Sequence, residues 1–260
     1  MSRPPRDPRN PRSPRNRKAP ERPAPAAPDE GESRLVFTPD PDARRRAFSP
    51  ARKAAALTAI ILGSSLAFID GSIVGVALPA IQGDLAAGAG QIQWVVNGYL
   101  LAVGALVLIG GAAGDRYGRK RVFLIGTVLF TLASLLCGAV WPAENLIAGR
   151  VLQGLGAAML IPTSLALIPV CFGEHERGRA LGLWAGASAL AAAAAPILGG
   201  WLTEAVIWRA VFFINGPVAL AAIVLALIAI PESRDRDAHA PDWTGAALGA
   251  LSLGLFGWGL

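Results

Sequence analysis

Two ionisable residues, Asp70 and Arg150, interrupt long apolar stretches of this 260-residue chain and are the first candidates for chemistry. A charge near the centre of a membrane-spanning helix costs at least about 2.5–3.5 kcal/mol, so such residues face a protein interior or a water-filled cavity. Asp70 stands ten residues before Ala80 and Arg150 six after Glu144. The helical rise then places them about 15 Å and 9 Å from the same end of the bundle. At these depths their side chains can pair.

Such a pair has two interpretations. Burial favours the protonated form of a carboxylic acid, whereas a cation within about 4–6 Å favours the carboxylate. If movement makes and breaks the pair, Asp70 is a proton or cation site whose occupancy Arg150 modulates. If the pair is static, it only locks two helices together. We favour the first interpretation, because ionisable groups inside a membrane are usually functional.

Small and polar residues follow Arg150 on the same stretch, namely Gln153, Gly154 and Gly156. Arg and Gln on one helix face with glycines nearby predict a polar helix that packs tightly beside a cavity. Further glycines stand four residues apart and predict close helix contacts elsewhere. These pairs are Gly71 and Gly75, Gly110 and Gly114, Gly182 and Gly186, and Gly245 and Gly249.

Pro196, Gly199 and Gly200 form another pattern of this kind. Proline removes a backbone hydrogen bond from a helix, so we expect a bend or a looser helix here.

The elements that carry these residues are apolar runs of membrane-spanning length. The chain is 53% hydrophobic and 16% charged, and roughly 20 apolar residues cross about 30 Å of hydrocarbon. The runs do not alternate as the strands of membrane barrels do. We therefore predict an all-α polytopic membrane protein. The runs cover 54–80, 94–113, 122–140, 146–170, 180–202, 211–230 and 243–260.

The predicted domains follow from these runs. We expect a six-helix transmembrane bundle over 54–230 and a loop over 231–242. Residues 243–260 would begin a seventh transmembrane helix, which is cut short by the chain end. Because a natural carboxyl terminus usually leaves a polar end outside the bilayer, the sequence indicates the amino-terminal part of a longer product or a truncated reading frame.

Residues 1–53 have a different composition. They hold 14 of the 24 basic residues, 7 of the 18 acidic residues and 12 of the 20 prolines, which gives this segment a charge of +7. A segment with so few large apolar residues cannot offset its chain entropy, so we predict a disordered tail. We expect contact with an anionic membrane surface in preference to nucleic acid.

Loop charges predict the orientation in the membrane. Basic residues gather in the connections 115–121, 172–179 and 232–242, whereas the alternating connections carry Asp84, Glu144, Glu204 and a single cation, Arg209. Short basic loops stay in the cytoplasm. We therefore expect a multi-pass protein of the cell membrane with a cytoplasmic amino terminus.

The sequence offers no enzyme chemistry. It contains no ATP-binding Walker motif, no nucleophile beside a base and no metal-ligand cluster, so we expect neither a cofactor nor a metal. Glu174, His175 and Glu176 are interpreted as a solvated turn, and two isolated cysteines predict no disulfide framework.

Several stretches resemble a known family. The segment from Gly111 to Arg121 reads GAAGDRYGRKR and closely resembles the loop signature between the second and third helices of the major facilitator superfamily, with Ala113 in place of the usual Leu. Leu146 to Ala158 resembles the fourth-helix signature of its proton-coupled members. The chain therefore resembles the six-helix amino-terminal half of a major-facilitator fold.

Three stretches resemble the fourteen-helix drug:proton antiporter branch in particular: 68–79, 93–101 and 208–217. The fifth-helix signature departs from the pattern, because Ala195 replaces the usual Gly before Pro196. The resemblance implies that Asp70 is a protonation or cation-recognition residue and that Arg150 is a coupling residue. It implies a conformational latch in the loop after the second helix, with these members: Gly111, Asp115, Arg116, Gly118, Arg119 and Lys120.

The implied function is proton-coupled efflux of a small hydrophobic or cationic compound, which would bind in a central cavity. Asp70, Arg150, Gln153, Trp94 and Tyr99 are the expected coupling and wall residues, with interfacial anchoring as an alternative role for Trp94. The family needs a second six-helix half, so we expect the latch loop to lack a partner in this chain. The alternatives are a non-transporting fragment or one half of a split transporter with a separately encoded carboxyl-terminal half.

Overall fold

A computed structural model describes residues 49–139, 142–235, 244–245, 248–249 and 252. The chain divides into two units, Met1–Ala47 and Phe48–Leu260, and all described residues belong to the second. Most of the predicted tail over 1–53 and most of the predicted seventh helix over 243–260 lie outside the described residues.

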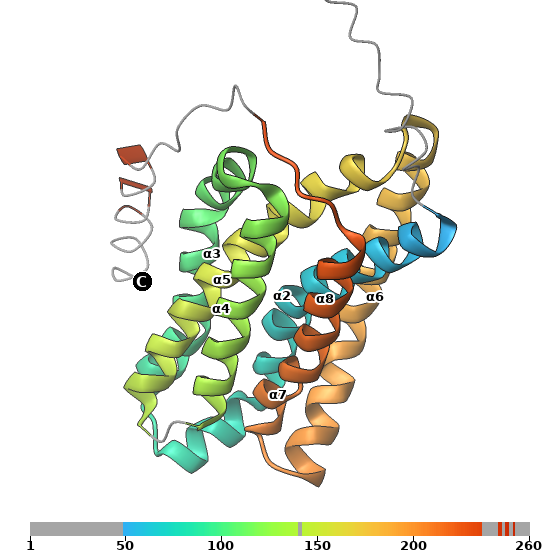
Figure 1. Cartoon of the computed structure of the whole chain (residues 1–260). Helices are drawn as coiled ribbons and strands as arrows, with labels where there is room; N and C mark the ends of the chain where they lie inside the picture. The colour runs from blue at the N-terminus through green and yellow to red at the C-terminus, as the bar shows by residue number, and fades with distance from the viewer. Residues whose placement is uncertain (1–48, 140–141, 236–243, 246–247, 250–251, 253–260) are drawn as a thin grey trace, which may run out of the picture. The chain divides into compact units, whose positions relative to one another are not determined.

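The described residues form helices and no strand. Six segments are long and apolar enough to cross a membrane, the last of them running over 210–229 through α7 and α8. The predicted all-α bundle with six spans is therefore confirmed (Figure 1). The helices are α2 (Pro50–Leu85), α3 (Ala89–Tyr117), α4 (Arg119–Ala139), α5 (Ala143–Cys171), α6 (Glu174–Ala205), α7 (Ala210–Phe213) and α8 (Asn215–Ala229).

Local sequence explains several helix boundaries. The Ser49 side chain accepts a hydrogen bond from the Arg52 backbone N–H at 3.2 Å, and Pro50 occupies the first turn of α2, where its missing N–H is harmless. Gly118 separates α3 from α4 with a φ of 116°, a conformation that glycine adopts readily. The solvated turn predicted for residues 174–176 is wrong in one respect, since these exposed residues form the first turn of α6.

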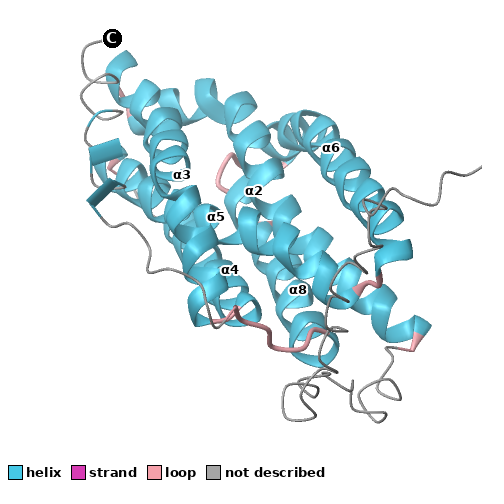
Figure 2. Ribbon diagram, turned by 90° about the horizontal axis from the view of Figure 1, so that it is seen from above, coloured by secondary structure: helices cyan, strands magenta, loops and turns pink. Residues whose placement is uncertain are grey.

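The helices lie in two groups of three, as the side and top views show (Figures 1 and 2). In one group α5 packs against α3 and α4, and in the other α2 packs against α6 and α8. Contacts between α2 and α5 join the two groups along a seam. A residue of α2 or α5 that faces this seam is therefore enclosed from both sides.

Glycines let α5 lie close to its neighbours. A Cβ added to Gly154 would lie 2.7 Å from the backbone oxygen of Tyr99, and one added to Gly156 would lie 2.6 Å from the backbone nitrogen of Phe130. Both distances are far below van der Waals contact. The tight packing predicted for this helix is therefore observed on two of its sides.

The glycine pairs behave differently from one another. A Cβ on Gly110 would collide with the Ala158 carbonyl, and one on Gly114 would lie 2.7 Å from Thr163 Cγ2, so this pair does support a close contact. The prediction is wrong at Gly75, Gly182 and Gly186, where no described atom counted as a neighbour lies within 4 Å of an added Cβ. Gly245 and Gly249 stand where few residues are described.

Two of the spans keep most of their apolar surface uncovered. Only 11% of the residues in the most apolar stretch of α6 are buried, and 22% in that of α3. Large side chains such as Leu108, Leu190 and Ile197 are more than two-thirds exposed. Such faces require hydrocarbon or another apolar partner.

Candidate functional site

The seam encloses the predicted ion pair. Asp70 on α2 and Arg150 on α5 are almost completely buried, and Arg150 Nη1 donates to Asp70 Oδ2. Gln153, one turn after Arg150, donates from Nε2 to Asp70 Oδ1 at 2.6 Å and accepts from Arg150 Nη1 at 2.8 Å. The spacing of three residues places Arg150 and Gln153 on one face of α5, so both reach the same carboxylate.

Tyr99 on α3 supports Arg150 from another side. The Arg150 guanidinium carbon lies 4.3 Å from the centre of the Tyr99 ring, a favourable distance for a cation and an aromatic ring. The Tyr99 hydroxyl donates to the Ala67 carbonyl at 2.9 Å, and Arg150 Nε donates to the Val95 carbonyl at 3.0 Å. Tyr99 is buried and joins α3 to the ion pair.

Two further polar residues complete the cluster, and sequence reasoning did not single them out. Asn215, the first residue of α8, directs Nδ2 towards Asp70 Oδ1 at 3.4 Å and donates to Ser134 Oγ on α4 at 2.9 Å. Ser134 in turn donates to the Phe212 carbonyl at 2.9 Å. The sequence did offer a signal for Asn215: it is a polar amide between Phe213-Ile214 and Gly216-Pro217, in an otherwise apolar segment.

Five helices therefore contribute to one buried network, which we call the seam cluster: Asp70, Tyr99, Ser134, Arg150, Gln153 and Asn215. Its charge balance is neutral while Asp70 is ionised. Because the surroundings exclude water, a change in the charge of Asp70 would act on Arg150 with little screening. The attraction between these two charges thus joins α2 to α5 across the seam.

The setting of Trp94 is a cavity between α3 and α5. Trp94 borders this cavity of about 230 Å³ together with Gly98 and Val151, and none of the six seam-cluster residues lines it. The lining of this cavity and the seam cluster thus have no residue in common.

The latch loop has partners within the chain, so the expectation that it lacks one is wrong. Lys120 Nζ donates to the carbonyl oxygens of Leu227 and Ile230 at 3.0 and 2.7 Å. The Arg119 N–H donates to the Ser233 carbonyl at 2.8 Å, and the Asp235 N–H to the Asp115 carbonyl at 2.9 Å. The segment after α8 crosses to the α3–α4 junction and binds there, as the pink loop in Figure 2 shows.

Side chains of the latch loop also interact with one another. Arg119 contacts Asp115 Oδ1 through Nε at 2.8 Å and Nη2 at 2.7 Å, and Arg116 lies 5.9 Å from the Tyr117 ring centre. A Cβ on Gly118 would lie 2.6 Å from Glu232 Oε1, while one on Gly111 would lie 3.4 Å from Pro162. Both glycines therefore stand where a neighbouring segment comes close.

The fifth-helix signature lies against α2 near the seam cluster. A Cβ on Gly199 would lie 2.6 Å from Ile73 Cγ1, and Gly200 faces Val76 at an ordinary distance of 3.8 Å. Helix α6 continues through Pro196 to Ala205. Ala195, which replaces the usual glycine, is 1% exposed within the same apolar core as Ile73, so its methyl group is accommodated.

A second polar cluster closes the other end of α2. Arg209 Nη1 and Trp208 Nε1 both donate to Asp84 Oδ2, at 2.6 and 3.0 Å, and the Arg209 guanidinium lies 4.2 Å from the Trp208 ring centre. This arrangement joins the end of α2 to the start of α7. It fixes the entry into the segment that delivers Asn215.

Known proteins share both the sequence and the fold. The chain is 38% identical to the tetracenomycin C resistance and export protein of Streptomyces glaucescens over 78% of this chain and 38% of that protein. It is 40% identical to a probable actinorhodin transporter of Streptomyces coelicolor over 84% of this chain and 38% of that one. It is 36% identical to the methylenomycin A resistance protein of Bacillus subtilis over 78% of this chain and 44% of that protein. The chain thus spans less than half the length of these relatives.

A solved structure shows the same fold at lower sequence similarity. It is a bacterial homologue of the human lysosomal transporter Spinster, with a TM-score of 0.59 and 21% identity, and the match covers 74% of this chain and 47% of that one. Residues 60–259 match the Major Facilitator Superfamily. These matches identify a multi-pass membrane protein of a transporter family and not an enzyme: the chain belongs to the Major Facilitator Superfamily.

Proposed function

We propose that this chain is the amino-terminal half of a proton-coupled exporter of small hydrophobic or cationic compounds, with Asp70 as the proton site. The observation that carries the proposal is the buried pair of Asp70 and Arg150 across the seam. The curated relatives with antibiotic resistance or export in their names support the direction of transport.

The coupling follows from the geometry of the seam cluster. While Asp70 is ionised, Arg150 and Gln153 bind it and hold α5 against α2. Protonation of Asp70 removes the negative charge, so Arg150 keeps only Val95, Gln153 and the Tyr99 ring as partners. The attraction across the seam then falls, and a conformation with α2 and α5 further apart becomes more populated.

The substrate would bind between this half and a second half, where α3 and α6 present uncovered apolar faces. Transporters of this architecture place their sites near the membrane midplane between two repeats. Basic residues at the α3–α4 and α5–α6 junctions support a cytoplasmic location for that end and for the amino terminus in the cell membrane. The latch loop would contact the second half from the same side.

The test is transport in inverted membrane vesicles that contain the chain together with a second half. With an imposed pH gradient, Asp70→Asn is expected to abolish the accumulation of a fluorescent cationic dye while membrane insertion remains intact. Glu204→Gln, which neutralises an exposed acid near the end of α6, is the matched control and should transport normally. Unchanged gradient-driven transport by Asp70→Asn would refute the role of Asp70.

The same vesicles address the alternatives. If the chain transports the dye only when a separately expressed second half is present, it is one component of a split transporter. If the DNA downstream encodes further apolar runs in frame, the chain is part of one longer product. Failure to transport with either kind of second half, despite correct insertion, would leave a non-transporting membrane fragment.

A further inference from the structure

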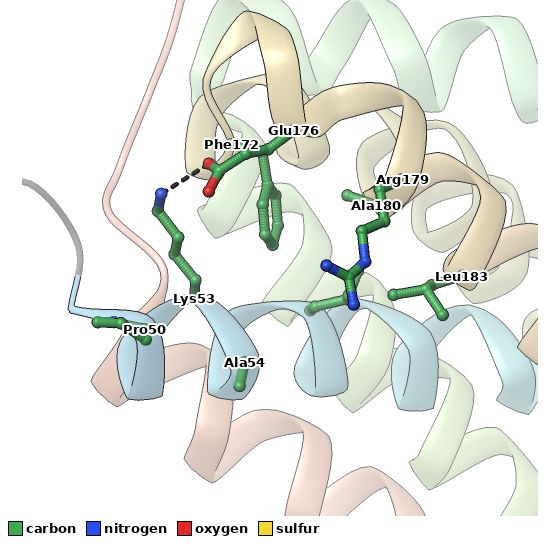
Figure 3. A pocket seen from close by; sticks show the side chains of 9 residues that line it. Pro50, Lys53, Ala54, Phe172, Glu176, Arg179, Ala180 and Leu183 are labelled. Atoms are coloured by element: carbon green, nitrogen blue, oxygen red, sulfur yellow. Dashed lines mark hydrogen bonds and ion pairs between the residues drawn. The ribbon is translucent and has the colours of Figure 1, made fainter.

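A cavity of about 410 Å³ lies between the first turns of α2 and the start of α6 (Figure 3). None of the seam-cluster residues lines it. Lys53 and Leu57 of α2 border it on one side, and Glu176, Arg179 and Leu183 of α6 on the other. Phe172, just before α6, closes it. The site and function described above do not use any of these side chains.

The charges in the cavity do not balance. Lys53 Nζ and Glu176 Oε2 form an ion pair at 2.6 Å across the cavity mouth. Arg179 extends from α6 towards α2, as Figure 3 shows, and no described residue forms a hydrogen bond or ion pair with its guanidinium. Lys53 and Glu176 neutralise each other, so the charged side chains that line the cavity leave one net positive charge, that of Arg179.

The two helices place polar and apolar side chains in the same order along the cavity. Leu57 follows Lys53 by four residues and Leu183 follows Arg179 by four. Residues four apart lie on the same helix face one turn away, so both helices place a cation at the rim and a leucine one turn deeper. Lys53 and Arg179 also stand immediately before apolar membrane-spanning stretches. The polar rim therefore lies at the boundary between water and hydrocarbon.

We propose that this cavity binds an anionic membrane lipid, with the headgroup phosphate on Arg179 and Lys53 and an acyl chain against Leu57 and Leu183. Guanidinium groups bind phosphate through paired, charge-assisted hydrogen bonds. A soluble phosphate would use only the rim, whereas an amphiphile also covers the apolar floor. Bound in this way, the lipid would tie α2 to α6 at the basic end of the bundle.

The test measures retention of phosphatidylglycerol by the purified protein in neutral-lipid nanodiscs, using native mass spectrometry. Arg179→Gln is expected to reduce retention about fivefold, which matches the contribution of one basic residue at an anionic surface, and Arg179→Lys should restore part of it. Leu183→Ser should also reduce retention. Arg234→Gln is the matched control, because it removes one exposed positive charge from another basic connection and Arg234 does not line the cavity.

Inorganic phosphate serves as the second probe. At millimolar concentration it should not displace phosphatidylglycerol, and its binding should not respond to Leu183→Ser. Displacement by phosphate alone would show a soluble-anion site and overturn the assignment to a lipid. Equal losses in Arg234→Gln and Arg179→Gln would show an effect of general surface charge and overturn the assignment as well. Circular dichroism of each variant verifies that the bundle is intact.

Discussion

Breaking the ion pair between Asp70 and Arg150 one residue at a time should cost far more than removing both charges. The side chains are 0% and 2% exposed, respectively. Loss of one partner leaves the other charge buried without compensation, which costs about 3–5 kcal/mol. Removal of both charges takes away the attraction and the desolvation penalty together, so we expect a double variant within about 2 kcal/mol of the parent protein.

The stability lost in each single variant depends on the hydrogen-bond partners that the remaining charged group keeps. In Arg150→Met, Asp70 keeps the Gln153 donor at 2.6 Å, worth about 1.5–3 kcal/mol as a hydrogen bond to a charged group. It also keeps the more distant amide of Asn215 at 3.4 Å. These donors only partly replace a guanidinium. In Asp70→Asn, Arg150 retains the Val95 carbonyl and the Gln153 oxygen, so we expect a similar or slightly smaller loss.

The assay is unfolding of the purified protein in mild detergent by titration with a denaturing detergent, followed by circular dichroism. The double variant Asp70→Asn with Arg150→Met should regain most of the stability that either single variant loses. The partly exposed pair of Asp115 and Arg119, at 41% and 25% exposure, is the control and should show a coupling below about 1 kcal/mol. If the stability lost in the double variant equals the sum of the two single losses, the proposed coupling between Asp70 and Arg150 is refuted.

Two further predictions concern packing and the residue that sequence reasoning missed. Gly156→Ala should destabilise the bundle by about 1–3 kcal/mol, because its Cβ would lie 2.6 Å from the Phe130 nitrogen. Gly182 has open space around it, so Gly182→Ala should be neutral or stabilise the bundle by up to about 1 kcal/mol. Asn215→Ala should cost about 1–3 kcal/mol by removing a buried donor, and exposed Asn145→Ala should change unfolding by less than about 0.5 kcal/mol; equal effects within either pair would contradict the packing described.

Much of the fold could be predicted because hydrocarbon imposes a length on each apolar run. Every backbone group must be satisfied inside the span, so runs of this length become helices whatever their neighbours. The same constraint made Asp70 and Arg150 conspicuous, and their depths along two helices limited how they could meet. These inferences need only the order of the residues and the thickness of a bilayer.

Contacts between helices could not be predicted in the same way. Glycine spacing is identical at residues 110 and 114 and at 182 and 186, yet only the first pair has close neighbours, because the contact depends on which helix lies opposite. The partners of Lys120 in the latch loop are backbone carbonyls more than 100 residues away. Carbonyls are present at every residue, so no sequence pattern marks them.

Residue types along single segments were enough to predict six membrane-spanning helices, two buried charges at compatible depths and the resemblance to the family. The contacts of Asn215 with Asp70 and Ser134, and the position of Arg179 in a cavity between α2 and α6, appear only in the folded chain. The physical reason is that hydrophobic length acts on each helix separately, whereas a polar network exists only where several helices direct side chains to one point.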